Sequence, residues 1–101
     1  MLVVTRYRVP AADPAAVEDF RRDAKAALDV LAVRPGFRSG RIGRNADDPD
    51  LWTLTTEWIN VGSYRRALSP FEVKTTAVPL LSRCIDEPTA YEVVESVDGS
   101  D

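Results

Sequence analysis

The sequence predicts an α+β domain with the element order β-α-β-β-α-β, a four-stranded antiparallel sheet with helices on one face. Three observations predict it. Strand-like segments with β-branched or alternating apolar residues cover residues 2–9, 37–44, 51–59 and 89–97. Helical segments lie between the first and second of these and between the third and fourth. The second and third strands are joined only by a short polar loop, as in an antiparallel hairpin.

The first strand ends at Pro10, and Asp13-Pro14 predicts the start of the first helix. Aspartate caps a helix through its side chain, and proline has no N–H to lose at the first helical position. The apolar residues of this helix then recur at steps of three and four, as Val17, Phe20, Ala24, Ala27, Leu28 and Leu31. Arg34-Pro35-Gly36 ends the helix.

The second strand, Phe37 to Arg44, contains Gly40 and Gly43, which indicate a bulge or a close backbone approach. The loop 45–50 holds three aspartates but lacks the turn glycine and distal glutamate of a calcium loop. We therefore interpret it as a solvated turn.

The third strand, Leu51 to Ile59, places its tryptophans and Leu54 on one face, because strand side chains alternate. Asn60 is expected to cap a short helix over 61–68. Ser69-Pro70-Phe71-Glu72 has the pattern of a capping box and predicts a second helical start near Pro70. Pro79 is expected to kink or end that helix.

A single domain is expected over 1–97, with a frayed tail at 98–101. Helices on one face leave the other face of the sheet uncovered, and that face is expected to carry Leu51, Thr53, Thr55, Glu57 and Ile59. We expect a homodimer in which a second copy covers this face and Tyr91 to Val94 exchange pairing across a two-fold axis.

Composition excludes several classes of chemistry. The 101 residues include no histidine, which removes histidine-dependent triads, histidine-ligated metal and histidine-ligated haem. The one cysteine, Cys84, allows no internal disulfide or thiolate cluster and is interpreted as a small buried hydrophobe. No apolar run reaches the ~20 residues of a membrane span, and no signal peptide is evident, so a cytoplasmic protein without a membrane partner is expected.

The formal net charge of −3 argues against nucleic-acid binding. An RNA-recognition domain shares this element order, but its third strand carries a basic and aromatic glycine-rich signature that LWTLTTEW lacks. Four arginines punctuate one segment, at 34, 38, 41 and 44. They are interpreted as a solvated face, with a local anion site as the alternative.

Five features together resemble the antibiotic biosynthesis monooxygenase-like family, small dimeric α/β barrels of the ferredoxin-like class. They are the strand LVVTRYRV, the Pro35-Gly36-Phe37 junction, the loop DDPD, Glu57-Trp58 at the end of the third strand, and Ser69-Pro70-Phe71. The haem-degrading branch is disfavoured by this resemblance, because its asparagine, tryptophan and histidine align with Thr5, Ala67 and Ala77.

The resemblance implies instead a cofactor-free oxygenase that acts on an anthrone, quinol or other aromatic polyketide-like substrate, whose own anion supplies electrons to dioxygen. Trp58, Tyr64 and Arg6 are the catalytic candidates: Trp58 as the floor of an apolar slot, Tyr64 as a hydrogen-bond donor and Arg6 as a partner for an enolate. The candidates for substrate binding are Tyr7, Trp52, Leu68 and Phe71. The alternatives are that both tryptophans only build the core, and that the dimer binds a small apolar ligand without catalysis.

Overall fold

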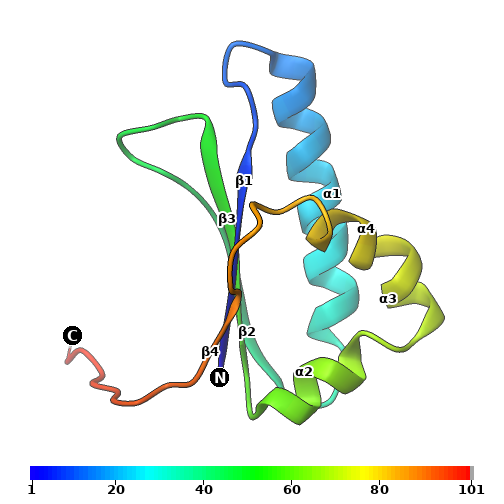
Figure 1. Ribbon diagram of the computed structural model, residues 1–101, viewed down its shortest axis with the longest axis vertical. Helices are drawn as coiled ribbons and strands as arrows, with labels where there is room; N and C mark the ends of the chain where they lie inside the picture. The colour runs from blue at the N-terminus through cyan, green and yellow to red at the C-terminus, as the bar shows by residue number, and fades with distance from the viewer. Residues whose placement is uncertain (101) are drawn as a thin grey trace.

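The computed structural model describes residues 1–100 and confirms the predicted fold class (Figure 1). The elements are β1 (Leu2–Arg8), α1 (Pro14–Ala32), β2 (Phe37–Arg44), β3 (Leu51–Trp58), α2 (Val61–Ala67), α3 (Phe71–Thr76), α4 (Val78–Leu81) and β4 (Ala90–Tyr91). The strands form one antiparallel sheet in the order β2-β3-β1-β4. Figure 1 shows this sheet nearly edge-on, with every helix on one side and the C-terminal segment leaving on the other.

Strand alternation decides which side chains enter the core. In β1 and β3, every second residue is buried against the helices, and the residues between them are partly exposed on the open face. The register places Tyr7 opposite Trp52 and Thr5 opposite Leu54. The two middle strands therefore present one continuous buried surface to α1.

The start of α1 forms as its sequence predicts. Asp13 adopts an extended conformation and its side chain accepts a hydrogen bond from the Ala16 N–H, while Pro14 occupies the first turn. The helix ends at Ala32, and Gly36 (φ 88°) then turns the chain into β2. A side chain at Gly36 would be strained, because this backbone conformation is one that L-residues rarely adopt.

The two glycines of β2 differ in their surroundings. A Cβ atom at Gly40 would lie 2.3 Å from Cδ1 of Leu28, so the absence of a side chain lets α1 approach the sheet closely. At Gly43 the nearest neighbour would be Cγ2 of Thr53, at 3.3 Å. The register shift in β2 falls earlier, between Phe37 and Ser39. Both the predicted close approach and the predicted irregularity are present, at different residues.

The second helical region differs from its prediction. Pro70, not Ser69, is the residue before α3, and no side chain caps this helix. Pro70 is extended (φ −58°, ψ 145°), so Ser69 lies one residue too early to complete the expected capping box. The helix ends at Thr76, and Pro79 falls in the first turn of α4, where it is tolerated.

The last strand is much shorter than the predicted 89–97. Only Ala90 and Tyr91 pair with β1, opposite Val3 and Leu2. Because β1 begins at Leu2, which already pairs with Tyr91, β1 has no further residue with which the chain beyond Tyr91 could pair. Residues 92–100 have no regular secondary structure. The predicted tail at 98–101 falls in this part of the chain, except for residue 101, which lies outside the described residues.

Candidate functional site

Trp58 is the centre of an aromatic group between β3 and the short helices. Its side chain is 1% exposed, and its indole N–H donates to Oγ1 of Thr56 across 2.8 Å. The ring of Phe37 meets it edge-on at 5.2 Å between centroids, and Tyr64 packs against it at 5.6 Å with a 54° tilt. Neither Thr56 nor Phe37 was among the site residues predicted from the sequence. The alternation of β3 places Thr56 on the same face as Trp58, but the hydrogen bond depends on the rotamers of both side chains.

Tyr64 lies on α2, whose start is fixed by Asn60. The Asn60 side chain accepts a hydrogen bond from the Ser63 N–H at 2.8 Å, as the sequence predicts. Burial raises the pKa of the Tyr64 phenol, with a smaller contribution from Cys84. The phenol therefore stays protonated at neutral pH. Within residues 1–100 its hydroxyl makes no hydrogen bond to protein, so this group is able to donate one to a ligand.

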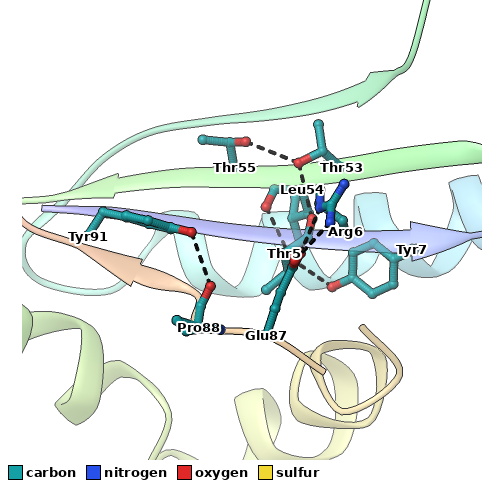
Figure 2. Close-up of polar contacts among 9 residues, drawn as sticks. All are labelled: Thr5, Arg6, Tyr7, Thr53, Leu54, Thr55, Glu87, Pro88 and Tyr91. Carbon is teal, nitrogen blue, oxygen red and sulfur yellow. Dashed lines mark hydrogen bonds and ion pairs between the residues drawn. The ribbon is translucent and has the colours of Figure 1, made fainter. Parts of the chain in front are cut away.

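Tyr7 and Trp52 belong to a second aromatic group, in which Phe20 of α1 lies between them. The Phe20 ring is 5.0 Å from Tyr7 and 5.4 Å from Trp52 between centroids. The Tyr7 hydroxyl donates to Oγ1 of Thr5 at 2.9 Å, and Thr5 in turn donates to the Leu54 carbonyl at 3.1 Å (Figure 2). Burial raises the pKa of Tyr7 to about 12. The donor capacity of Tyr7 is thus already used within the protein.

Trp52 has a different partner on its face. The guanidinium carbon of Arg44 lies 5.2 Å from the centroid of the indole ring, a cation–π contact. The indole N–H is buried and has no hydrogen-bond partner within residues 1–100. Since Trp52 and Trp58 are six residues apart on one strand, their Cα atoms are separated by roughly 20 Å. The two tryptophans therefore belong to opposite ends of the sheet.

Arg6 lies on the other face of the sheet. Its Nε and Nη2 atoms bond the two carboxylate oxygens of Glu87 at 2.6 and 2.8 Å (Figure 2). The hydrogen bond from Arg6 lowers the pKa of the Glu87 carboxyl and raises that of Arg6. Because strand alternation turns Arg6 away from Tyr7 and Thr5, it does not share a compartment with Trp58 or Tyr64 within one chain.

The remaining two candidates differ in burial. Leu68 follows the last residue of α2 and packs, partly buried, against the core. Phe71, at the start of α3, is 81% exposed. Of the seven predicted site residues, the structure therefore brings Trp58 and Tyr64 together, and Tyr7 and Trp52 together through Phe20.

The space around Trp58 is filled by side chains. Neither Trp58 nor Tyr64 lines any of the five described hollows. A hollow of about 530 Å³ lies next to α2 and β4, with Met1, Asn60, Val61 and Tyr91 on its wall. Another, of about 340 Å³, lies on the open face and includes Arg6, Thr53 and Thr55.

Residues 1–100 contain neither a cluster of metal ligands nor a membrane-spanning helix. No group of three or more carboxylate, thiol or imidazole side chains is arranged to hold a metal ion. No helix in this part of the chain is both long and apolar enough to cross a bilayer.

Known structures share this architecture. A conserved protein from Methanosarcina mazei Go1 is 25% identical, with a TM-score of 0.68 over 88% of this chain and 84% of its own. SnoaB from Streptomyces nogalater, a cofactor-independent oxygenase, is 22% identical, with a TM-score of 0.68 over 94% and 96%. A putative antibiotic biosynthesis monooxygenase from Deinococcus radiodurans is 14% identical, with a TM-score of 0.72 over 100% of both chains. Among curated proteins, no sequence matches this chain.

The family comparison agrees with the fold. Residues 1–76, from β1 to the end of α3, match the family model described as antibiotic biosynthesis monooxygenase. This span includes β3, which carries both tryptophans, and α2, which carries Tyr64. The chain belongs to the antibiotic biosynthesis monooxygenase family.

Proposed function

We propose that this chain is a cofactor-independent monooxygenase that oxidises an anthrone- or quinol-like aromatic substrate with dioxygen. The family match supports the class of reaction, and the likeness in fold to SnoaB, a cofactor-independent oxygenase, is consistent with it. The observation that carries the proposal is the pairing of Trp58 with Tyr64, because it sets a large aromatic surface beside a phenol that is free to donate.

The proposed chemistry needs little from the protein. An anthrone methylene is oxidised to a carbonyl by one dioxygen molecule, R₂CH₂ + O₂ → R₂C=O + H₂O, with the electrons supplied by the substrate's own carbanion or enolate. The protein's part is to hold the aromatic rings and to stabilise the oxyanion. Trp58 supplies a flat apolar surface and Tyr64 donates a hydrogen bond to the oxyanion. A phenol whose pKa is raised remains a donor throughout the neutral range.

Access to Trp58 requires movement of the short helices. α2, α3 and α4 contain seven, six and four residues, and helices this short depend on packing for their stability. They cover the same side of the sheet as the lower part of α1 in Figure 1. We propose that the segment 61–81 opens as a lid that admits the substrate between Tyr64 and Trp58.

A second candidate function follows from the closed interior. The indole N–H of Trp58 is already bonded to Thr56, and the described hollows lie away from it. These two facts favour a non-catalytic module that binds a small apolar ligand at the rim, for example in the hollow beside α2 and β4. Such a module would bind ligand without consuming dioxygen.

A homodimer is part of the proposal. The open face of the sheet is uncovered in one chain, and the residues that follow β4 carry exposed valines: Val93 at 44%, Val94 at 87% and Val97 at 95% exposure. The segment that carries them leaves on the open side of the sheet in Figure 1. A partner subunit would bury these valines, while in isolation they are exposed to water. Light scattering is expected to give twice the chain mass of 11.2 kDa, and a particle of 11.2 kDa at micromolar concentration would contradict the dimer.

Oxygen uptake separates the two functions. The pure, chelator-treated protein is mixed with an anthrone, and dioxygen consumption is followed against buffer. We expect acceleration that Tyr64→Phe lowers about 100- to 1,000-fold, the size typical of losing one donor to an oxyanion. Tyr91→Phe is the matched control, because Tyr91 is half-exposed in β4 and donates to the Pro88 carbonyl (Figure 2). Ligand binding without oxygen uptake would support the non-catalytic module instead.

A further inference from the structure

A small hollow of about 160 Å³ lies between the loop after α1 and the helix α2. Arg34 and Pro35 line it from the loop, and Ser63, Arg66 and Ala67 line it from α2. Figure 1 shows α2 beside the C-terminal end of α1, which brings these two segments together. None of the candidate oxygenase residues lines this hollow.

The hollow gathers hydrogen-bond donors that the protein leaves unused. The Nε atom of Arg34 is buried and has no partner within residues 1–100, although its side chain as a whole is 29% exposed. Burying a donor without a partner is unfavourable, so such donors are usually satisfied by a ligand, ion or water. Ser63 is 6% exposed, and its Oγ accepts a long hydrogen bond of 3.4 Å from Nη2 of Arg66. This leaves the hydroxyl proton of Ser63 free to donate.

The positive charge of the hollow is poorly neutralised. The nearest carboxylate to Arg34 is that of Glu72 on α3, with Oε1 at 3.9 Å from Nη1. For Arg66, no carboxylate in the described part of the chain lies within 4.0 Å of the guanidinium. Two guanidinium groups therefore line one small space, with a single distant carboxylate beside them. This stands out in a chain whose formal net charge is −3.

The geometry of the hollow is fixed by the backbone around it. Gly36 packs so closely on α2 that a Cβ atom there would lie 2.5 Å from both Cβ and Oγ of Ser63. The Ile59 N–H donates to the Gly36 carbonyl at 2.8 Å, and the Phe37 N–H donates to the Arg34 carbonyl at 3.2 Å. With the segment 61–81 closed, as it is in this structure, the loop and α2 are thus held together before any ligand binds.

We propose that this hollow is a phosphate-binding site. A volume of 160 Å³ is below the ~300 Å³ at which pockets begin to hold drug-sized molecules, but it accommodates a compact anion. Two arginines match the charge of a dianionic phosphate, and their planar groups suit its oxygens. Ser63 adds a hydroxyl donor. The same chemistry recognises free inorganic phosphate and the phosphate of a small monoester.

Phosphate titration of the full chain tests this proposal. Amide chemical shifts are recorded at constant ionic strength, with chloride replaced by phosphate, and glycerol phosphate is titrated in a parallel series. We expect saturable shifts centred on Gly36 and Ser63. Shifts with inorganic phosphate alone would identify the free anion as the ligand, and equal or tighter binding of glycerol phosphate would identify a monoester.

Variants decide which groups bind. Arg34→Gln and Arg66→Gln are each expected to weaken phosphate binding tenfold or more, the effect of losing one charge-assisted hydrogen bond. Arg65→Gln is the matched control, because Arg65 lies on the same helix but lines the separate hollow beside β4. Glu72→Gln is expected to tighten binding about threefold, since it removes the carboxylate that competes for Arg34.

Three results would overturn the proposal. The first is that chloride causes the same amide chemical shift changes as phosphate. The second is that the shift changes are spread over all exposed arginines, and the third is an equal loss of binding in Arg65→Gln and Arg66→Gln. If the arginine variants do not fold, Ser63→Ala keeps the Cβ that packs on Gly36 and removes only the hydroxyl. This variant is expected to bind phosphate about threefold more weakly or worse, and unchanged binding would also count against the site.

Discussion

The hydrogen bond between Trp58 and Thr56 is expected to stabilise the core measurably. Trp58→Phe removes a 2.8 Å bond inside the protein and part of a side chain that is 1% exposed. The smaller ring buries ~50 Å² less surface, which at ~25 cal/mol per Å² costs about 1.3 kcal/mol. Losing the hydrogen bond adds about 1 kcal/mol. The free energy of unfolding should therefore fall by about 2–3 kcal/mol.

A double-mutant cycle separates the two contributions. Thr56→Val in the native background leaves the buried indole N–H without an acceptor and should cost about 1–3 kcal/mol. In the Trp58→Phe background the same substitution removes no partner and should be nearly neutral. The coupling energy is then about 1–3 kcal/mol. Urea unfolding followed by tryptophan fluorescence gives all four free energies, because Trp52 is present in all four proteins. If the free-energy changes of Trp58→Phe and Thr56→Val are additive, the hydrogen bond between the two side chains does not stabilise the fold.

Three further predictions concern single contacts. Because Arg6 lowers the pKa of Glu87, the ion pair stabilises the fold above pH 4.5, the ordinary pKa of a glutamate, and this stabilisation is lost as the pH falls below that value. A carboxyl NMR titration should give Glu87 a pKa below 4.5 that returns to the ordinary value in Arg6→Gln, and an unchanged pKa in Arg6→Gln would exclude the pair. Since burial raises the pKa of Tyr7 to about 12, the neutral phenol stabilises the fold fully below pH 10, its pKa in the unfolded chain, and this stabilisation is lost as the pH rises through about 12. In a pH titration followed by phenolate absorbance, the tyrosine that titrates last should be missing from Tyr7→Phe, and an unchanged titration would contradict the prediction. Gly40→Ala should lower the free energy of unfolding by about 1–3 kcal/mol, because the added Cβ would collide with Leu28. Gly43→Ala, whose Cβ would lie 3.3 Å from Thr53, is the milder control in thermal unfolding, and equal losses in the two variants would show that Gly40 is not a contact point.

The order of elements could be predicted because local signals agreed with the fold. Asp13-Pro14 and Asn60 are helix starts whose side-chain hydrogen bonds depend only on nearby residues, and both form. Alternation in β3 correctly placed Trp52 and Trp58 on one face. The expected capping box at Ser69 failed because Pro70 stays extended and shifts the start of the helix by one residue.

The length of the last strand depends on a partner strand, which its own sequence does not describe. Val93 and Val94 have the β-branched side chains of a strand, but β1 begins at Leu2 and offers no further pairing. The expected strand is therefore only two residues long in one chain. If a second copy supplies a neighbouring strand, residues 92–97 have the composition to extend it.

The candidate site was predictable only in part, because convergence is a tertiary property. Helix-like spacing could not show that Tyr64 packs on Trp58, nor that Phe71 points outward with 81% exposure. Strand alternation already separated Arg6 from Tyr7, and that signal was sufficient to assign Arg6 to the open face. Its pairing with Glu87, 81 residues away, could not be read from the sequence.

Dioxygen consumption by the pure chain with an anthrone tests the central proposal most directly. The predicted result is a rate above buffer that yields the corresponding quinone and persists after chelation. This rate falls about 100- to 1,000-fold in Tyr64→Phe but not in Tyr91→Phe. A rate equal to that of buffer, with the protein folded throughout, would contradict the oxygenase function.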